Sequence, residues 1–176
     1  MKITDKYVFF YRGWPSNFTR SFFYFGYSLI EQPNEFFCSE QAFMYCKARY
    51  FRDIETAVQI LDALLPEEAK ALGRQVKNYN DTEWSKVRYS FMKLVNLHKY
   101  KQDWRLRKLL LNPEYDDKTF VEASPVDYIW GVGLDEADPR IDDPTNWKGL
   151  NLLGKALTEV RNELKTNPLI NLNHSI

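Results

Sequence analysis

Short apolar and aromatic runs near the N-terminus of the chain, and one later run, are typical of strands. They cover residues 6–12, 22–25, 27–31 and 119–123. The second and third runs flank Gly26, so we expect them to form a hairpin. Between the early and late strands the apolar spacing changes to that of helices.

Helical periodicity is clearest from about Asp81 to Gln102, where apolar residues recur at intervals of three and four. Ser39 is the expected N-cap of an earlier helix, and Asp53 the cap of the next. Pro66 is expected to open a third helix that Gly73 ends. The remaining helices are expected at residues 39–51, 54–64, 66–73, 104–111 and 152–165. This order of strands and helices predicts an α+β fold rather than a βαβ array.

Composition excludes several classes of protein. The 176 residues fit one domain with a short tail. Lys+Arg and Asp+Glu both number 24, so no net charge attracts nucleic acid or an anionic membrane, although a local basic groove stays open. No apolar run approaches the roughly 18 residues of a membrane span, and the N-terminus lacks the apolar core of a signal peptide. We expect a cytoplasmic protein without a membrane partner.

Cysteines and histidines are scarce. Cys38 and Cys46 lie two turns apart, and we expect buried thiols rather than a disulfide. His98 and His174 are the only histidines, so a Ser-His-Asp triad or a His-rich metal site is hard to build. If the chain is an enzyme, carboxylates or a lysine must carry the proton chemistry. Aromatic residues make up 16% of the chain, enough for a large core or for a pocket that holds a flat ligand.

Common cofactor and metal motifs are missing from the sequence. Gly131-Val132-Gly133 does not continue to a third glycine, no Walker A sequence occurs, and the two cysteines have no zinc-ligand partners. We therefore expect an activity that needs neither a cofactor nor a metal.

The helix that begins near Ser39 presents one candidate site. Glu40 would lie at its first position, where the free N–H groups and the helix dipole favour the ionised carboxylate. Lys47 falls on the same face, about 10 Å further along the axis. A carboxylate and an amine on an apolar helix face are a candidate site, but a solvated helix with a charged end has the same pattern.

The segment from Glu122 to Gly133 presents a second candidate. It follows a predicted strand and places two carboxylates and Trp130 in a loop that glycines allow to approach closely. Each residue also has a structural alternative: Glu122 alternating outward on its strand, Asp127 capping a turn, and Trp130 in the core.

Several short motifs occur in a fixed order along the chain. They are Pro15-Ser16-Asn17-Phe18, Ser39-Glu40-Gln41-Ala42-Phe43 with Lys47, Leu72-Gly73-Arg74, Trp84 with Arg88, Glu122…Asp127…Trp130-Gly131, and Gly149-Leu150-Asn151-Leu152-Leu153-Gly154 with Arg161. This ordered set resembles the NADAR superfamily of YbiA-like N-glycosidases, from about Phe9 to Leu164. The acidic segment from Leu134 to Asn146 is longer than expected of bacterial members.

The resemblance implies one α+β domain over residues 1–165, with a small, mostly antiparallel sheet surrounded by several helices, and a tail over residues 166–176. It implies a hydrolase that cleaves the N-glycosidic bond between a (phospho)ribose and a base or amine. Bacterial relatives are similar to enzymes that act on ribosylamino-pyrimidine phosphates of riboflavin biosynthesis. Other members remove ADP-ribose from guanine. The family residues match Glu40, Trp84, Asp127 and Trp130 here.

The chemistry of these residues agrees with that reaction. Cleavage of a C1′–N bond builds positive charge on the sugar, which a fixed carboxylate stabilises. Glu40 suits that role or water activation, and Asp127 suits leaving-group protonation or water positioning, although the two are exchangeable. Lys47 is expected either to contact a phosphate or to attack C1′ of an opened ribose, unless it is simply a surface lysine.

The remaining candidates are substrate-binding residues. Trp84 and Trp130 suit stacking on a base, and Gly131 lets the loop approach the substrate. Asn17 and Asn151 either bind sugar hydroxyls or cap turns. We expect the two tryptophans to line one pocket with the three catalytic candidates.

Two other functions remain open. Removal of ADP-ribose from guanine in nucleic acid requires a basic lip, for which the segment from Lys99 to Lys108 is the candidate. A non-catalytic ADP-ribose or nucleotide sensor would need the aromatic residues but not both carboxylates.

Overall fold

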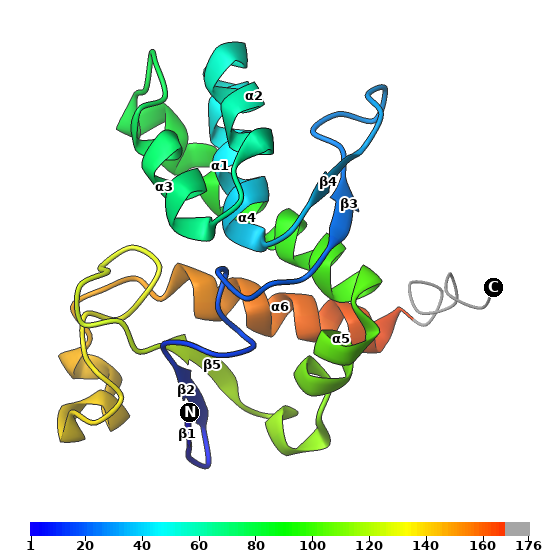
Figure 1. Cartoon of the computed structure of the whole chain (residues 1–176). Coiled ribbons are helices and arrows are strands. Elements are labelled where there is room, and N and C mark those ends of the chain that lie inside the picture. The colour runs from blue at the N-terminus through cyan, green and yellow to red at the C-terminus, as the bar shows by residue number, and fades with distance from the viewer. Residues whose placement is uncertain (168–176) are drawn as a thin grey trace. The chain divides into compact units, whose positions relative to one another are not determined.

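The structure is a computed structural model that describes residues 1–167 of the chain (Figure 1). The chain divides into two compact units, Asn17–Asp103 and a second unit made of Met1–Ser16 with the chain from Trp104 onward. The expected tail covers residues 166–176. Its part from residue 168 on, which includes His174, lies outside the described residues. Helices and strands occur in both units, which confirms the α+β class.

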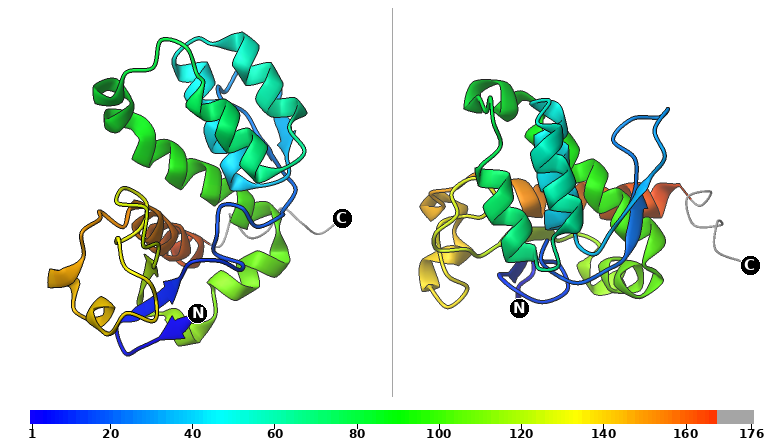
Figure 2. Two further views of the ribbon diagram at one scale, coloured as in Figure 1. Left: turned by 60° about the vertical axis from the view of Figure 1, so that its left-hand side comes forward. Right: turned by 45° about the horizontal axis from the view of Figure 1, so that its top comes forward.

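The unit Asn17–Asp103 is built around helix α1 (Ser39–Tyr50). This helix packs against α2 (Ile54–Asp62), α3 (Pro66–Arg74) and α4 (Asp81–Gln102), and Figure 2 shows the group from two sides. Because three helices cover α1, its side chains are buried around most of its circumference. The predicted starts at Asp53 and Pro66 and the predicted extent of α4 are confirmed.

The same unit contains a two-stranded antiparallel sheet of β3 (Phe23–Phe25) and β4 (Asn34–Phe36). The expected strand at residues 27–31 is wrong, because this segment lies in the loop between β3 and β4. Its side chains have partners on helices instead: Tyr27 stacks on Phe91 with ring centroids 5.7 Å apart, and Glu31 pairs with Arg49. A sequence pattern of local strand propensity does not reveal such distant partners.

The N-cap of α1 is Cys38, not Ser39 as expected. Cys38 Sγ accepts a hydrogen bond from the Gln41 N–H at 3.4 Å. Ser39 Oγ donates instead to Asn96 Oδ1 on α4 at 3.1 Å. The hydroxyl of Ser39 thus bonds to Asn96 rather than capping the helix, and Ser39 lies in the first turn together with Glu40.

Gly73 was expected to end the third helix, but it lies inside α3, which continues to Arg74. A Cβ at this position would lie 2.0 Å from Met44 Sδ on α1. The glycine therefore serves the close packing of α3 on α1 rather than a helix end.

The second unit contains a three-stranded sheet in the order β1 (Lys2–Ile3), β2 (Tyr7–Phe10) and β5 (Thr119–Glu122). β1 pairs with β2 antiparallel, whereas β5 runs parallel to β2. Helix α6 (Leu152–Thr166) packs along β5, and α5 (Trp104–Leu110) begins this part of the chain. Within residues 1–167 the strands thus form two sheets rather than one, with two of the three pairings antiparallel.

Alternate residues of β2 face different parts of this unit. Phe9 packs into a buried cluster with Val121, Val132 and Ile141. Phe10 faces the other way, with its ring centroid 6.4 Å from that of Phe120.

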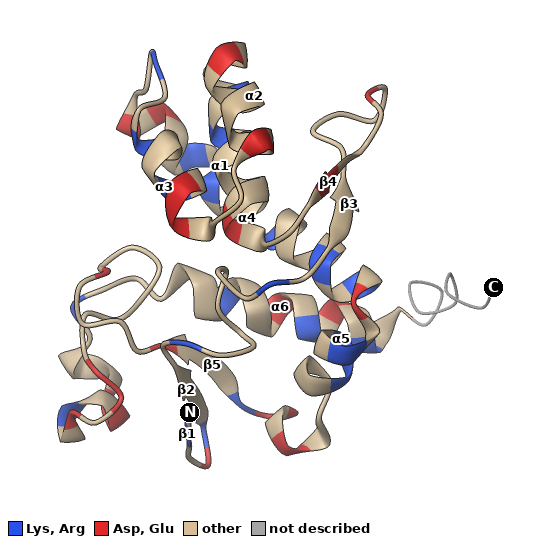
Figure 3. Cartoon of the chain, viewed as in Figure 1, with Lys and Arg blue, Asp and Glu red and all other residues tan. Residues whose placement is uncertain are grey.

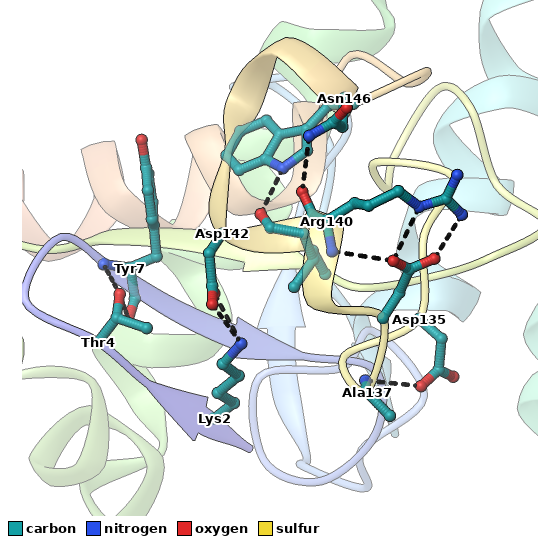
Figure 4. Close-up of polar contacts among 11 residues, drawn as sticks. Lys2, Thr4, Tyr7, Asp135, Ala137, Arg140, Asp142 and Asn146 are labelled. Carbon is teal, nitrogen blue, oxygen red and sulfur yellow. Dashed lines mark hydrogen bonds and ion pairs between the residues drawn. The ribbon is translucent and has the colours of Figure 1, made fainter.

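The acidic segment 134–146 is fastened to the N-terminal strands of this unit (Figure 4). The Lys2 ammonium donates to Asp142 Oδ1 at 2.7 Å. Asp135, Asp138 and Asp143 each accept a hydrogen bond from the backbone N–H two residues later. The short helices η2 (Pro139–Asp142) and η3 (Pro144–Asn146) follow from these turns. Much of the acidic character of the segment therefore serves its own turns.

Candidate active site

Glu40 lies in the first turn of α1 and is 6% exposed. Its N–H donates to the backbone oxygen of Asn17 at 3.0 Å. The free N–H groups of the helix start and the macrodipole favour a negative charge at this position. Glu40 is thus a buried carboxylate whose backbone is fixed at a helix terminus.

A buried polar network holds this helix start. Asn96 Nδ2 donates to Asn17 Oδ1 at 3.3 Å and to Met92 O at 3.1 Å, and Asn96 Oδ1 accepts from Ser39 Oγ. Asn17 also donates from Nδ2 to Met92 Sδ at 3.2 Å. These contacts leave Asn17 buried and bound to protein partners through both its side chain and its backbone. Its geometry is that of a residue that positions Glu40.

Lys47 lies two turns after Glu40 on α1 and is half-buried. Its ammonium donates to Gly73 O at 2.8 Å and lies 4.1 Å from the centroid of the Tyr79 ring. Burial lowers the pKa of Lys47; the Asp81 carboxylate opposes this shift, and the charge of Arg74 adds to it. The carbonyl and the aromatic face both stabilise the charged amine where it lies.

Trp84 is 4% exposed and lies in an aromatic cluster. It is stacked with Phe91, with centroids 5.7 Å apart and an interplanar angle of 19°, and it also contacts Phe43, Tyr50 and Phe51. These contacts place Trp84 where α4 packs on α1, and Phe91 already covers one face of its ring.

Asp127, in the second unit, is half-buried in the loop after β5. Its Oδ1 accepts hydrogen bonds from the N–H of Ile129 at 2.9 Å and of Trp130 at 2.7 Å. The N–H of Asp127 donates to Ser124 Oγ at 3.2 Å. One carboxylate oxygen therefore caps the turn that leads to Trp130, while Oδ2 accepts no hydrogen bond from the residues that the structure describes.

Gly131 follows the half-buried Trp130 and lies against the end of β5. A Cβ on Gly131 would lie 2.9 Å from both Glu122 O and Ser124 Cβ. The next N–H, of Val132, donates to Glu122 O at 3.0 Å. The absence of a side chain at Gly131 therefore fixes how the loop with Asp127 and Trp130 approaches the strand.

Asn151 holds the same loop from the other side. It is 1% exposed and adopts a left-handed conformation with φ 53°. Its Nδ2 donates to Phe120 O and its Oδ1 accepts from the Glu122 N–H, both at 3.0 Å. Its own N–H donates to Gly131 O at 3.1 Å. The amide thus closes the edge of β5, which is a positioning contact.

Several residues that hold these groups were not predicted from the sequence. Gln41 Nε2 donates to Ile60 O at 2.9 Å, and its Oε1 accepts from the Phe37 N–H at 3.1 Å, so it joins α1 to α2. Asn96, a polar residue in the apolar pattern of α4, was the available signal for the network under Glu40. Tyr79, beside Lys47, gave no signal in the sequence.

Within residues 1–167, no three His, Cys, Asp or Glu side chains are grouped so that they could hold a metal ion. Both cysteines are buried as free thiols, as expected. In the same part of the chain, none of the helices combines the length and the apolar character that a bilayer crossing requires.

Comparisons with known proteins agree with the motif order. The family model described as the NADAR domain matches residues 3–165. The chain is 37% identical over 174 residues to an N-glycosidase of Acanthamoeba polyphaga mimivirus, a match that covers 91% of this chain and 97% of that protein. It is 42% identical over 134 residues to protein irg-1 of Caenorhabditis elegans, which covers 75% of this chain and only 62% of that longer protein.

A solved structure supports the same relationship. The NMR structure of the Escherichia coli protein YbiA matches with a TM-score of 0.71 at 25% identity, over 99% of this chain and 94% of that chain. The family model, the relatives and the fold therefore agree, and the chain belongs to the NADAR domain family.

Proposed function

We propose that the chain is an N-glycosidase that hydrolyses the bond between C1′ of a ribose and the nitrogen of a base or amine. Glu40 carries this proposal, because it is a buried carboxylate fixed at a helix start in a chain whose viral relative is named an N-glycosidase. Positive charge develops on the sugar as the C1′–N bond breaks, and a carboxylate fixed in advance stabilises it without reorganisation.

Asp127 is the second acidic group in the proposal. Its Oδ1 is occupied by two backbone N–H groups, which orient the carboxylate. The other oxygen suits protonation of the leaving nitrogen or positioning of the water. Either carboxylate, Asp127 or Glu40, suits either of these roles.

The aromatic candidates receive different roles. Trp130 is half-buried and is proposed to stack on the base, while Gly131 brings it to the end of β5. Trp84 is proposed to form a wall of the binding site, since Phe91 already covers one of its faces. Asn17 and Asn151 are proposed to position Glu40 and the Asp127 loop, respectively.

Lys47 had two expected roles, and its contacts favour the cationic one. The Gly73 carbonyl accepts from its ammonium, and the Tyr79 ring lies beneath it. Attack on C1′ of an opened ribose would require the neutral amine. Burial lowers the pKa of Lys47 and so favours that neutral form. Borohydride trapping of the imine separates these roles, because only the nucleophilic role leaves a covalent sugar adduct on Lys47.

For the substrate we propose a small ribosylated and phosphorylated amine, such as the ribosylamino-pyrimidine phosphates. Removal of ADP-ribose from guanine in nucleic acid is the alternative: in the segment expected to supply the basic lip, Lys99 is fully buried, whereas Arg105 and Lys108 are exposed. The presence of both Glu40 and Asp127 favours catalysis over a non-catalytic sensor. Mass spectrometry of the products from a panel of ribosylated amines, nucleotides and ADP-ribosylated oligonucleotides distinguishes these substrates.

Glu40→Gln tests the chemistry on the substrate that this panel identifies. The variant keeps the size of the side chain but removes its charge, so kcat should fall at least about 100-fold with little change in affinity. Trp130→Ala should instead weaken substrate binding by roughly 1–3 kcal/mol. Glu55→Gln is the matched control, since Glu55 lies in the first turn of α2 but pairs with Lys77 at the surface. A folded Glu40→Gln variant with full activity would refute the role of Glu40.

A further inference from the structure

A cluster of charged and aromatic side chains lies in the unit Asn17–Asp103, where α1 meets the start of α4. Lys47 comes from α1, Tyr79 from the loop before α4, and Asp81 and Arg88 from α4. The Lys47 ammonium lies over the Tyr79 ring, and the Tyr79 hydroxyl donates to Asp81 Oδ1 at 2.7 Å. Asp81 in turn faces Arg88. Figure 3 shows the charged residues of these helices.

Arg88 is the member of the cluster whose position its contacts do not explain. Its side chain is only 13% exposed, and its buried Nε has no hydrogen-bond partner among residues 1–167. Its Nη1 lies 3.7 Å from Asp81 Oδ1, beyond the usual hydrogen-bond range of about 2.7–3.2 Å. A buried donor without an acceptor destabilises the folded chain. An oxygen-rich ligand would supply the missing acceptor.

The charges around Arg88 favour an anion. Burial lowers the pKa of Lys47 most; the nearby carboxylate of Asp81 opposes this shift, and the nearby charge of Arg74 adds to it. Lys47 and Arg88 therefore both lie near the Asp81 carboxylate, and Lys47 also lies near Arg74. The planar guanidinium of arginine binds phosphate oxygens through two parallel N–H groups, and the lysine ammonium adds a compact charge.

We propose that Arg88 and Lys47, with Tyr79 as an aromatic wall, form a subsite for a phosphate group of the substrate. The assignment of that phosphate to a ribosylated amine rests on the proposed N-glycosidase function. Glu40 and Lys47 lie on the same side of α1 and about 10 Å apart along its axis. A ribose 5-phosphate also carries its anomeric carbon and its phosphate at opposite ends. Asp81 holds the Tyr79 hydroxyl and competes with the ligand for Arg88.

Binding of ribose 5-phosphate, ribose and ADP-ribose to the full chain, measured by titration calorimetry at low ionic strength, tests the subsite without any turnover. Ribose 5-phosphate should bind at least about tenfold more tightly than ribose, because charge-assisted hydrogen bonds to phosphate are strong. Arg88→Gln should remove most of this difference and leave ribose binding unchanged. Arg88→Lys should keep part of it, since the charge remains but the paired N–H groups do not.

Two further variants sharpen the test. Asp81→Asn removes the competing charge but keeps an acceptor for Tyr79, so it should tighten binding of ribose 5-phosphate severalfold. Lys86→Gln is the matched control: Lys86 is exposed on the same helix and pairs with Glu83, and its replacement should change nothing. Arg88-dependent binding of ADP-ribose at higher affinity than ribose 5-phosphate would assign the subsite to a pyrophosphate rather than to a monoester.

The subsite is overturned if the wild-type chain binds ribose 5-phosphate no better than ribose, or if folded Arg88→Gln binds both like the wild type. An equal loss of affinity for ribose and ribose 5-phosphate in Arg88→Gln would also overturn it, because Arg88 would then act only on the structure. Failure of every ribosylated amine to turn over would refute the proposed function instead, and an Arg88-dependent preference for phosphate would survive that result.

Discussion

Glu40 and Asp127, the two carboxylates of the proposed site, are held in place by different means. Glu40 lies on a helix that three other helices cover, and its position is set by packing and by the Asn17 backbone. Asp127 lies in a loop that its own carboxylate caps. The two positions therefore differ in their support: packing and a backbone hydrogen bond fix the start of the helix that carries Glu40, whereas Asp127 uses one side chain for the turn and for the proposed chemistry.

Asp127→Asn and Asp127→Ala separate these two uses, and they have the largest expected effect. Asn keeps an oxygen that accepts from Ile129 and Trp130, so the loop should persist while kcat falls at least about 100-fold. Ala removes the cap as well, and should lower the free energy of unfolding by a further ~0.5–2 kcal/mol. Steady-state kinetics and urea unfolding measure the two effects. A fully active Asp127→Asn would leave Asp127 as a turn cap alone.

Glycines at close contacts extend the comparison to backbone packing. Gly131→Ala would place Cβ 2.9 Å from the backbone oxygen of Glu122, which cannot move without disturbing β5. We therefore expect the free energy of unfolding to fall by about 1–3 kcal/mol. At Gly73→Ala the three nearest atoms to the new Cβ all belong to the side chain of Met44, and a methionine adapts more easily than backbone. The first substitution should therefore destabilise the chain more than the second in urea unfolding. The reverse order would mean that the helical unit is the less adaptable one.

The same contrast explains what the sequence could predict. The helix over Asp81–Gln102 and the starts at Asp53 and Pro66 were predicted because their signals are local: periodicity, a side-chain cap and a proline. The cap at Ser39 was predicted wrongly because Asn96, 57 residues away, provides the partner of its hydroxyl.

The candidate site divides in the same way. Glu40 and Asp127 stood out because charge at a helix start and in a glycine-containing loop is visible in the sequence. The supporting contacts of Asn17 and Asn151 depend on segments distant in the chain, Met92 and Asn96 for the first and β5 for the second. Sequence left open whether these asparagines bind sugar or cap turns, and their amides bind the protein itself.

Burial in the helical unit also predicts a pH effect. Burial lowers the pKa of the wholly buried Lys99 to about 8, from its ordinary value of 10.5, although Cys38 and Asp103 oppose the shift. Between these values the unfolded chain binds more protons than the folded chain, so the free energy of unfolding rises with pH. The cost of charging Lys99 is fully present below pH 8 and is relieved as pH approaches 10.5.

Lys99→Met isolates this contribution, because methionine does not titrate. The unfolding free energy of the wild type relative to the variant should rise by about 2 kcal/mol between pH 7 and pH 9.5, measured by urea unfolding at each pH. A difference that does not change with pH would show that Lys99 titrates alike in the folded and unfolded chains.

The smallest effect is expected at the start of α1, where Cys38 has the N-cap role that was predicted for Ser39. Ser39→Ala removes the donor to Asn96 and should cost about 1 kcal/mol, since a buried acceptor loses its partner. Cys38→Ser should change stability by less than this, because serine is a favoured N-cap and can accept from the Gln41 N–H. Urea unfolding of both variants measures the comparison. If Cys38→Ser were the more damaging change, the thiol would be required for its packing among buried residues, and the stability of the helix start that carries Glu40 would rest on that packing rather than on its cap.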